Sequence, residues 1–203
     1  MIYKEFKDID IDNCINVFPV RKSTLAITQS LSLIQFRSVL EIGVGTGFTS
    51  IYLTKMGYDV EGTDIDKAAI ACAEKNANKN NLKINFIHSD LFAEVINKYD
   101  LLIFNPPVMH FDSYPLNKLL NLIKSLIPVS NKYIWMMYYS LFNSVKLKLI
   151  HRFMKDARYY LNNDGKIVLL QTKNEIELLS EIYGFKYRAI STVNSTKVIL
   201  IEW

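Results

Sequence analysis

Short apolar runs alternate with helical patterns along the chain from residue 38 onward. The apolar runs predict strands at 38–42, 58–64, 83–87 and 99–104, and the stretches between them predict helices at 48–56 and 67–80, with a short helix before the fourth strand. Strands that alternate with helices form a mostly parallel sheet, because each crossover must pack back onto one face. The pattern therefore predicts an α/β fold with a doubly wound sheet.

The alternation breaks after residue 106 and resumes near the end of the chain. The predicted elements are an amphipathic helix at 116–127, an aromatic and methionine-rich stretch at 132–142, a helix from Val145 to Leu161, a strand at 166–172 and a helix at 174–184. Two strand-like runs, 186–193 and 196–203, flank Asn194 and Ser195. These last runs predict an antiparallel hairpin.

No repeat, low-complexity tract or linker divides the 203 residues. We expect a single domain over 1–203, with a lead-in over 1–37 and an insert on the substrate side over 109–144. A mean hydropathy of +0.09 indicates a globular chain. The net charge of +4 permits an RNA or acidic partner but is too small to predict one.

Targeting and metal-binding signals are weak throughout the sequence. No apolar run reaches membrane-spanning length and the N-terminus does not resemble a signal peptide, so we expect a cytoplasmic protein without membrane contact. Cys14 and Cys72 lack metal-ligand spacing and are predicted to be buried free thiols. Three scattered histidines, His88, His110 and His151, argue against a metal site.

The first predicted strand runs into E-I-G-V-G-T-G-F, residues 41–48. Glycines at 43, 45 and 47 let the backbone turn tightly and approach a ligand closely. The helix that follows presents N–H groups at its first turn. A dinucleotide-binding G-x-G-x-x-G motif would need glycine at position 48, where this chain has Phe48. The turn therefore argues against a nicotinamide cofactor.

Acidic residues follow the next two predicted strands. Asp64 lies 21 residues beyond Gly43, at a strand end where a carboxylate can accept both hydroxyls of a ribose. Asp90 follows the third predicted strand and could accept from an adenine amine. The turn together with the two acids is a far more specific signal than a glycine-rich turn alone. The alternative is a plain α/β domain that has a glycine-rich turn and no such cofactor.

This arrangement resembles the class I S-adenosylmethionine-dependent methyltransferases over residues 38–203. Their E/D-x-G-x-G-x-G turn and their two acids match Glu41, Gly43, Gly45, Gly47, Asp64 and Asp90. The resemblance implies a Rossmann-like, seven-stranded sheet that is mostly parallel, with an antiparallel C-terminal strand. It also implies S-adenosyl-L-methionine as the cofactor. The glycines would cradle its methionine part, and Glu41 would orient the amine side through the turn.

The fourth predicted strand ends in Asn105-Pro106-Pro107. This stretch resembles the N/D-P-P-Y/F motif of methyltransferases that modify planar nitrogens, whose delocalised lone pair makes them poor nucleophiles. The side-chain carbonyl of Asn105 and the backbone carbonyl of Pro106 can accept from the N–H groups of such a nitrogen and aim its lone pair at the methyl group. Asn105 would also border the cofactor, and the prolines would stiffen the turn. Alternatively, the double proline only ends the strand.

Among these enzymes the release-factor glutamine methyltransferases are most similar, through 17–27 and the stretches around Asp64, Asp90 and Asn105. A protein glutamine is therefore the preferred acceptor. An RNA base amine, a small-molecule amine or amide, and a catalytically silent cofactor-binding partner subunit are the alternatives. Dependence of the chain on a partner subunit is a further alternative. Val108 stands where the motif has an aromatic residue, so His110, Phe111 or Tyr114 would have to supply stacking against a flat substrate.

Two further features leave alternatives open. Lys148, Arg152 and Lys155 form one stripe of the predicted helix at 145–161. A solvated outer face is favoured over an RNA-binding face for this stripe. The aromatic residues of 132–142 could line a substrate pocket or cap the core.

Overall fold

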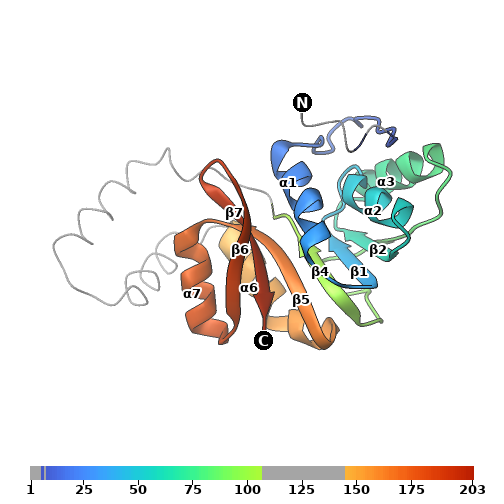
Figure 1. Cartoon of the computed structure of the whole chain (residues 1–203). Coiled ribbons are helices and arrows are strands. Elements are labelled where there is room, and N and C mark those ends of the chain that lie inside the picture. The colour runs from blue at the N-terminus through green and yellow to red at the C-terminus, as the bar shows by residue number, and fades with distance from the viewer. Residues whose placement is uncertain (1–5, 7, 107–144) are drawn as a thin grey trace.

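The computed structural model describes residue 6, residues 8–106 and residues 145–203, without the side chains of 145–147. Within these residues the strands form one sheet in the order β3-β2-β1-β4-β5-β7-β6 (Figure 1). The strands are β1 (Ser38–Ile42), β2 (Asp59–Asp64), β3 (Asn85–His88), β4 (Tyr99–Phe104), β5 (Leu161–Gln171), β6 (Lys186–Val193) and β7 (Thr196–Glu202). β7 runs antiparallel to both of its neighbours, β5 and β6, and the other pairs of described strands are parallel. The predicted Rossmann-like, mostly parallel sheet is confirmed.

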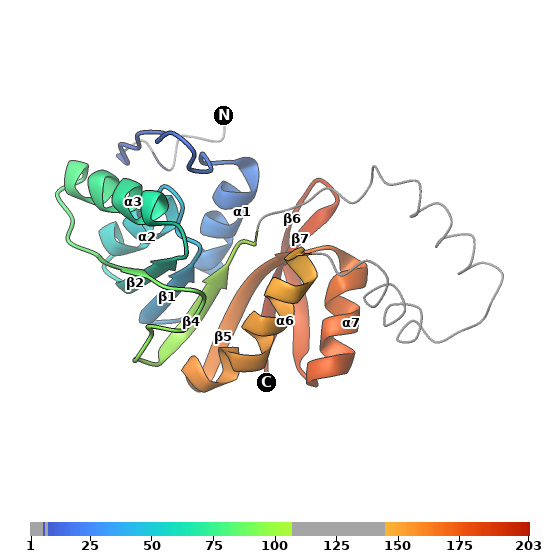
Figure 2. The ribbon, with the colours of Figure 1, turned by 180° about the vertical axis from the view of Figure 1, so that it is seen from behind.

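Helices cover both faces of this sheet (Figures 1 and 2). They are α1 (Lys22–Ser30), α2 (Phe48–Lys55), α3 (Lys67–Lys79), α6 (Val145–Ala157) and α7 (Lys173–Tyr183), with short 3-10 turns at Leu31–Leu33 and Arg158–Tyr160. Alternate residues of β4 and β5 are buried in two separate hydrophobic cores. Leu102 and Leu169 pack with residues of α6 and α7, whereas Leu101 and Val168 pack with residues of α1 and α2. Burial on both faces explains the unbroken apolar runs of these strands.

Most predicted elements lie where the sequence places them. Asp66 caps α3 by accepting from the backbone N–H of Ala68 at 2.8 Å, and Gly184 ends α7 in the left-handed conformation. Two predictions were wrong in detail. The chain between β3 and β4 forms turns at 91–94 rather than a short helix. The fifth strand begins at Leu161 instead of 166, because an irregularity in its pairing with β4 takes up the polar N-N-D-G stretch.

The strand registers bring the carboxyl ends of β1, β2 and β4 to one level. Ile42 of β1 pairs with Thr63 of β2 on one side and with Phe104 of β4 on the other. The next residue of each chain segment is Gly43, Asp64 or Asn105. In an open parallel sheet this edge is where ligands bind.

The prediction of free thiols was wrong, because Cys14 and Cys72 form a disulfide. The chain from Asp10 to Cys14 lies along α3, which brings the two Cα atoms of the cysteines within 6.1 Å although they are 58 positions apart in sequence. Disulfides are typical of oxidising compartments and of intracellular proteins of hyperthermophiles. The cytoplasmic location stays a prediction.

Several predictions concern residues outside the described part of the chain. These are the roles of Pro107, Val108, His110, Phe111 and Tyr114, and of the insert at 109–144 with its aromatic residues. Among the described helices, none is long and apolar enough to cross a membrane.

Candidate functional site

The glycine turn connects β1 to α2 through backbone that only glycine adopts readily. Gly43, Gly45 and Gly47 all have positive φ, at 77°, 53° and 78°. A Cβ on Gly47 would lie 2.9 Å from the Cβ of Ala73, so this glycine also lets α3 approach closely. Among the residues that the structure describes, a Cβ on Gly43 would meet no atom within 4 Å. The turn is therefore packed against α3 on one side and open at Gly43.

Strand β2 anchors the first half of the turn. The backbone N–H groups of Gly43 and Val44 both donate to the carbonyl of Thr63, at 2.7 and 3.1 Å. The carboxylate of Asp64 accepts from Gly45 through Oδ2 at 3.1 Å and from Asp66 through Oδ1 at 2.9 Å. Asp64 is half-buried. These contacts hold its carboxylate beside the glycines, as the position of a ribose acid requires.

Glu41 is buried where β1 meets the turn. One of its carboxylate oxygens accepts from the backbone N–H of Ser50 at 2.9 Å and from the Ser50 hydroxyl. Burial raises the pKa of Glu41 from 4.5 to about 7, although the hydrogen bonds from Ser50 oppose this shift. Glu41 thus ties the first turn of α2 to β1.

Asp90, which follows β3, contacts a side chain of α6. Its Oδ2 atom forms an ion pair with the guanidinium of Arg152 at 2.7 Å, and both side chains are partly exposed. Arg152 lies on α6, next to the buried Phe153 and Met154. One member of the predicted basic stripe is therefore paired with an acid of the candidate site, while Lys148 and Lys155 are exposed.

Asn105 and Pro106 follow β4 directly, at the level of the glycine turn. Asn105 is half-buried and Pro106 is buried. Strand alternation puts Asn105 on the same face as Leu101 and Ile103, which pack toward α1 and α2. The structure thus brings Asn105 to the edge that carries Gly43 and Asp64.

The geometry suits a cofactor that combines an amino acid, a ribose and a base. The open space at Gly43 offers room beside the backbone, and α2 begins there with its N-terminus toward the turn. Asp64 supplies an oriented carboxylate for paired hydroxyl groups. The residues present therefore fit S-adenosylmethionine.

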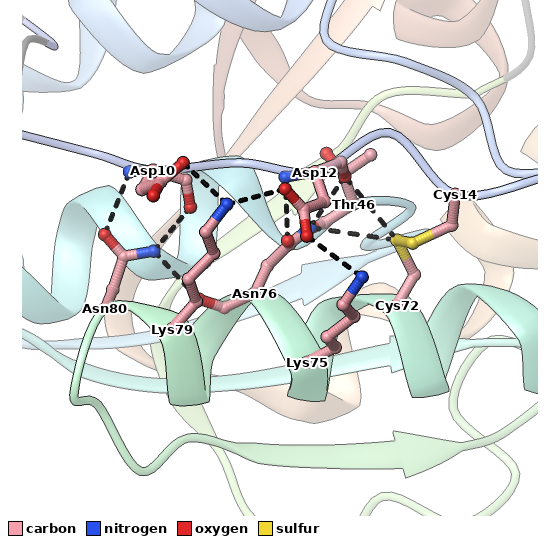
Figure 3. A network of polar contacts seen from close by, with 9 residues as sticks. All are labelled: Asp10, Asp12, Cys14, Thr46, Cys72, Lys75, Asn76, Lys79 and Asn80. Carbon is pink, nitrogen blue, oxygen red and sulfur yellow. Dashed lines mark hydrogen bonds and ion pairs between the residues drawn. A yellow bond between two sulfur atoms is a disulfide. The ribbon is translucent and has the colours of Figure 1, made fainter.

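Two contacts of this site were not predicted from the sequence. Asn76, on α3, donates to the backbone carbonyl of Thr46 inside the glycine turn at 2.9 Å (Figure 3). The carbonyl of Phe18 would lie 3.7 Å from a Cβ on Gly45, so the N-terminal segment passes over the turn. A weak signal for Asn76 exists in the sequence. It stands four residues after Cys72, beside the apolar face formed by Ala73 and Ala77.

A family model described as the methyltransferase small domain matches residues 15–132 of the chain. A putative protein N5-glutamine methyltransferase of Methanocaldococcus jannaschii is 39% identical over 94 residues, which cover 46% of this chain and 48% of the relative. The release factor glutamine methyltransferase of Streptococcus pneumoniae is 34% identical over 134 residues, covering 65% of this chain and 44% of the relative. The chain thus spans about half the length of these curated relatives.

Among solved structures, a 16S rRNA methyltransferase of Thermus thermophilus, in complex with AdoMet and guanosine, superposes with a TM-score of 0.65. Its sequence is 20% identical, and the match covers 93% of this chain and 44% of that one. At this identity the likeness shows a shared fold.

Proposed function

The chain belongs to the methyltransferase small domain family, and we propose that it transfers the methyl group of S-adenosylmethionine to a planar nitrogen, with a protein glutamine amide as the acceptor. The single observation that carries this proposal is the strand register. It places Asn105 at the same sheet edge as Gly43 of the turn and the oriented carboxylate of Asp64.

In this proposal the cofactor lies along the carboxyl ends of β1, β2 and β3. Gly43, Gly45 and Gly47 allow the backbone to approach its methionine part, and Asp64 accepts from the ribose hydroxyls. Asp90 uses Oδ2 for Arg152, so we assign Oδ1 to the adenine amine. Glu41 contributes indirectly, because its carboxylate accepts from the backbone N–H of Ser50 and so fixes the start of α2.

The bound cofactor supplies an electrophilic methyl group on a sulfonium, so the protein's task is to present the acceptor. An amide nitrogen is a weak nucleophile because its lone pair is delocalised into the carbonyl. The side-chain carbonyl of Asn105 and the backbone carbonyl of Pro106 would accept its two N–H groups. Two fixed acceptors hold the nitrogen at the methyl group and need no strong base, since the proton can leave after transfer.

The choice of glutamine over an RNA base draws support from the relatives. Both curated relatives described above carry glutamine methyltransferase in their names, and the second aligns over 65% of this chain. Sequence similarity to RNA methyltransferases covers less of the chain: a ribosomal RNA small subunit methyltransferase of Buchnera aphidicola is 43% identical over 34% of this chain, and the solved RNA methyltransferase is similar in fold. The ion pair of Arg152 with Asp90 also removes one cation from the stripe that would have met phosphates.

Two measurements test the proposal. Calorimetry should detect binding of S-adenosylmethionine to the purified protein, and absence of binding would contradict the cofactor assignment. Tritiated methyl transfer into a cell lysate should then label the protein fraction, in which mass spectrometry should find N5-methylglutamine. Label in the RNA fraction, with activity that falls by orders of magnitude between about 50 and 200 mM salt, would overturn the glutamine assignment.

A further inference from the structure

The N-terminal segment from Asp10 to Cys14 lies along α3 in the opposite direction (Figure 3). Residues later in the segment contact residues earlier in the helix. Asp10 meets Asn80, Asp12 meets Asn76, and Cys14 is bonded to Cys72. The three helix positions are four residues apart and so share one face of α3.

Both asparagines hold the backbone of the segment by paired hydrogen bonds. Asn80 accepts from the N–H of Asp10 at 3.1 Å and donates to the carbonyl of the same residue at 2.7 Å. Asn76 accepts from the N–H of Asp12 at 2.9 Å and donates to its carbonyl at 3.1 Å. Each side-chain amide thus pairs with the N–H and the C=O of one residue, as a neighbouring strand would. Because the atom that donates to the carbonyl must be the nitrogen, this pairing also fixes the orientation of the amide.

The two asparagines differ in their remaining hydrogen bond. The second N–H of Asn80 donates to the carbonyl of Asn76, within its own helix, at 2.8 Å. The second N–H of Asn76 donates to the carbonyl of Thr46 at 2.9 Å. Asn76 is completely buried. It therefore joins the segment, α3 and the glycine turn, whereas Asn80 joins the segment and α3.

The contact with Thr46 falls on the half of the turn that β2 does not hold. Contacts with Thr63 and Asp64 fix Gly43, Val44 and Gly45, as described above. Thr46 lies between two glycines with positive φ, where the backbone is least restricted by side chains. The carbonyl of Thr46 belongs to the same peptide group as the N–H of Gly47, which donates to the carbonyl of Val44 at 2.8 Å, so fixing the carbonyl also orients this N–H.

After Cys14, the chain that Asn76 holds continues to the glycine turn and lies beside it. Val17 is buried among Ala69 and Cys72, and the carbonyl of Phe18 comes next to Gly45. The ion pairs of Lys75 and Lys79 with Asp12 also attach the segment, but these side chains are partly exposed and contribute little. Asn76 is the buried joint between the segment and the turn.

We propose that Asn76 is a positioning residue for cofactor binding, because it holds the Thr46 carbonyl and the N-terminal segment in the arrangement that the cofactor meets. This inference rests on the proposed function. When Asn76 is absent, the turn should sample other conformations. The apparent affinity then falls by the fraction of molecules that remain competent, so a turn that is competent one time in ten binds about tenfold more weakly.

Asn80→Ala is the matched control for Asn76→Ala. Both substitutions remove an amide that pairs with the N–H and C=O of one residue of the segment. Only Asn76→Ala also removes the hydrogen bond to the carbonyl of Thr46. We expect S-adenosylmethionine to bind about tenfold or more weakly to Asn76→Ala, and within about twofold of wild type to Asn80→Ala. Asn76→Ser, which keeps one donor in a smaller volume, carries the comparison if the alanine variant does not fold.

A second measurement does not involve cofactor or activity. Amide hydrogen exchange in the protein alone should be faster at residues 43–47 in Asn76→Ala and unchanged there in Asn80→Ala. Steady-state kinetics should show a raised KM for S-adenosylmethionine and a kcat within about threefold of wild type.

The possible outcomes separate the two proposals. If the wild-type protein does not bind S-adenosylmethionine, the proposed function is wrong. If wild type binds, and the Asn76 and Asn80 variants match each other in affinity and in exchange at 43–47, the positioning role is wrong and the proposed function stands.

Discussion

The Oδ2 atom of Asp64 accepts a hydrogen bond from the backbone N–H of Gly45 at 3.1 Å. The acid assigned to the ribose is thus also part of the support of the glycine turn. Removing its side chain would change two things at once, the ribose contact and the turn. A substitution within the turn is therefore a better test of the cofactor site than one at Asp64.

Gly43→Ala should weaken binding of S-adenosylmethionine by at least about tenfold. The added methyl group would project into space where no atom of residues 6, 8–106 or 145–203 lies within 4 Å, and this is where we place the cofactor. Gly57→Ala is the control, because Gly57 also has a positive φ and open surroundings but lies in the turn between α2 and β2. Both variants should lose about 1–2 kcal/mol of stability through left-handed backbone. Calorimetry and urea denaturation measure the two effects, and equal affinities would argue against a cofactor at this turn.

Asn105→Ala should leave the affinity for S-adenosylmethionine nearly intact and reduce the rate of methyl transfer about a hundred- to a thousandfold. The loss corresponds to removal of one preorganised acceptor, roughly 2.7–4 kcal/mol. Asn105→Asp keeps the shape and the acceptor oxygens, so it should retain part of the activity. Single-turnover transfer to the acceptor found in the lysate measures both rates. Wild-type speed in Asn105→Ala would mean that the double proline only ends β4.

The sheet was predictable because its strands carry unambiguous local signals. The run at 99–104 is apolar and ends at an amide and two prolines, and β4 has these bounds. The predicted N-cap at Asp66 and hairpin at Asn194-Ser195 also depend on residues close together in the sequence. The fifth strand was placed five residues late, because N-N-D-G is typical of turns and the irregular pairing around it depends on β4.

The contacts of the N-terminal segment could not be predicted, because they join residues about 60 to 70 positions apart. The backbone N–H groups of Asp10 and Asp12 donate to the side chains of Asn80 and Asn76, which are 70 and 64 positions away. These contacts depend on the segment lying along α3, which no local pattern specifies. The pair of Asp90 with Arg152 was missed for the same reason, since it joins residues 62 positions apart in sequence.

Glu41→Gln should remove part of the pH dependence of stability. The pKa of Glu41 is raised from 4.5 to about 7 by burial. Below pH 4.5 the carboxyl is protonated in the folded and unfolded chains alike, and its burial carries no ionisation penalty. As the pH rises toward 7 and above, the unfolded chain is favoured because only there does the group ionise freely. The free energy of unfolding should fall by up to about 3 kcal/mol across this range.

The glutamine variant keeps an oxygen for Ser50 and carries no charge, so this decline should be absent from it. Urea denaturation at pH 5, 6, 7 and 8 measures both proteins. Burial lowers the pKa of His151, and comparing the two proteins at each pH cancels the contribution of this histidine. Parallel curves for wild type and Glu41→Gln would contradict the raised pKa.

Reduction of the Cys14–Cys72 bond should destabilise the protein without releasing the N-terminal segment. The bond closes a loop of 58 residues, and the loss of such a constraint on the unfolded chain is worth about 4 kcal/mol. The paired hydrogen bonds of Asn76 and Asn80 do not depend on the bond, so the affinity for S-adenosylmethionine should change by less than about threefold. Urea denaturation and calorimetry with and without dithiothreitol measure these effects.

A variant with both cysteines changed to serine is the control, because dithiothreitol should not alter its stability. Protein purified without reductant and alkylated in denaturant should gain no label, and protein treated with dithiothreitol first should gain two labels. Two labels on the untreated protein would show that the thiols are free in solution. Full loss of cofactor binding on reduction would instead mean that the disulfide, rather than the two asparagines, holds the segment against the turn.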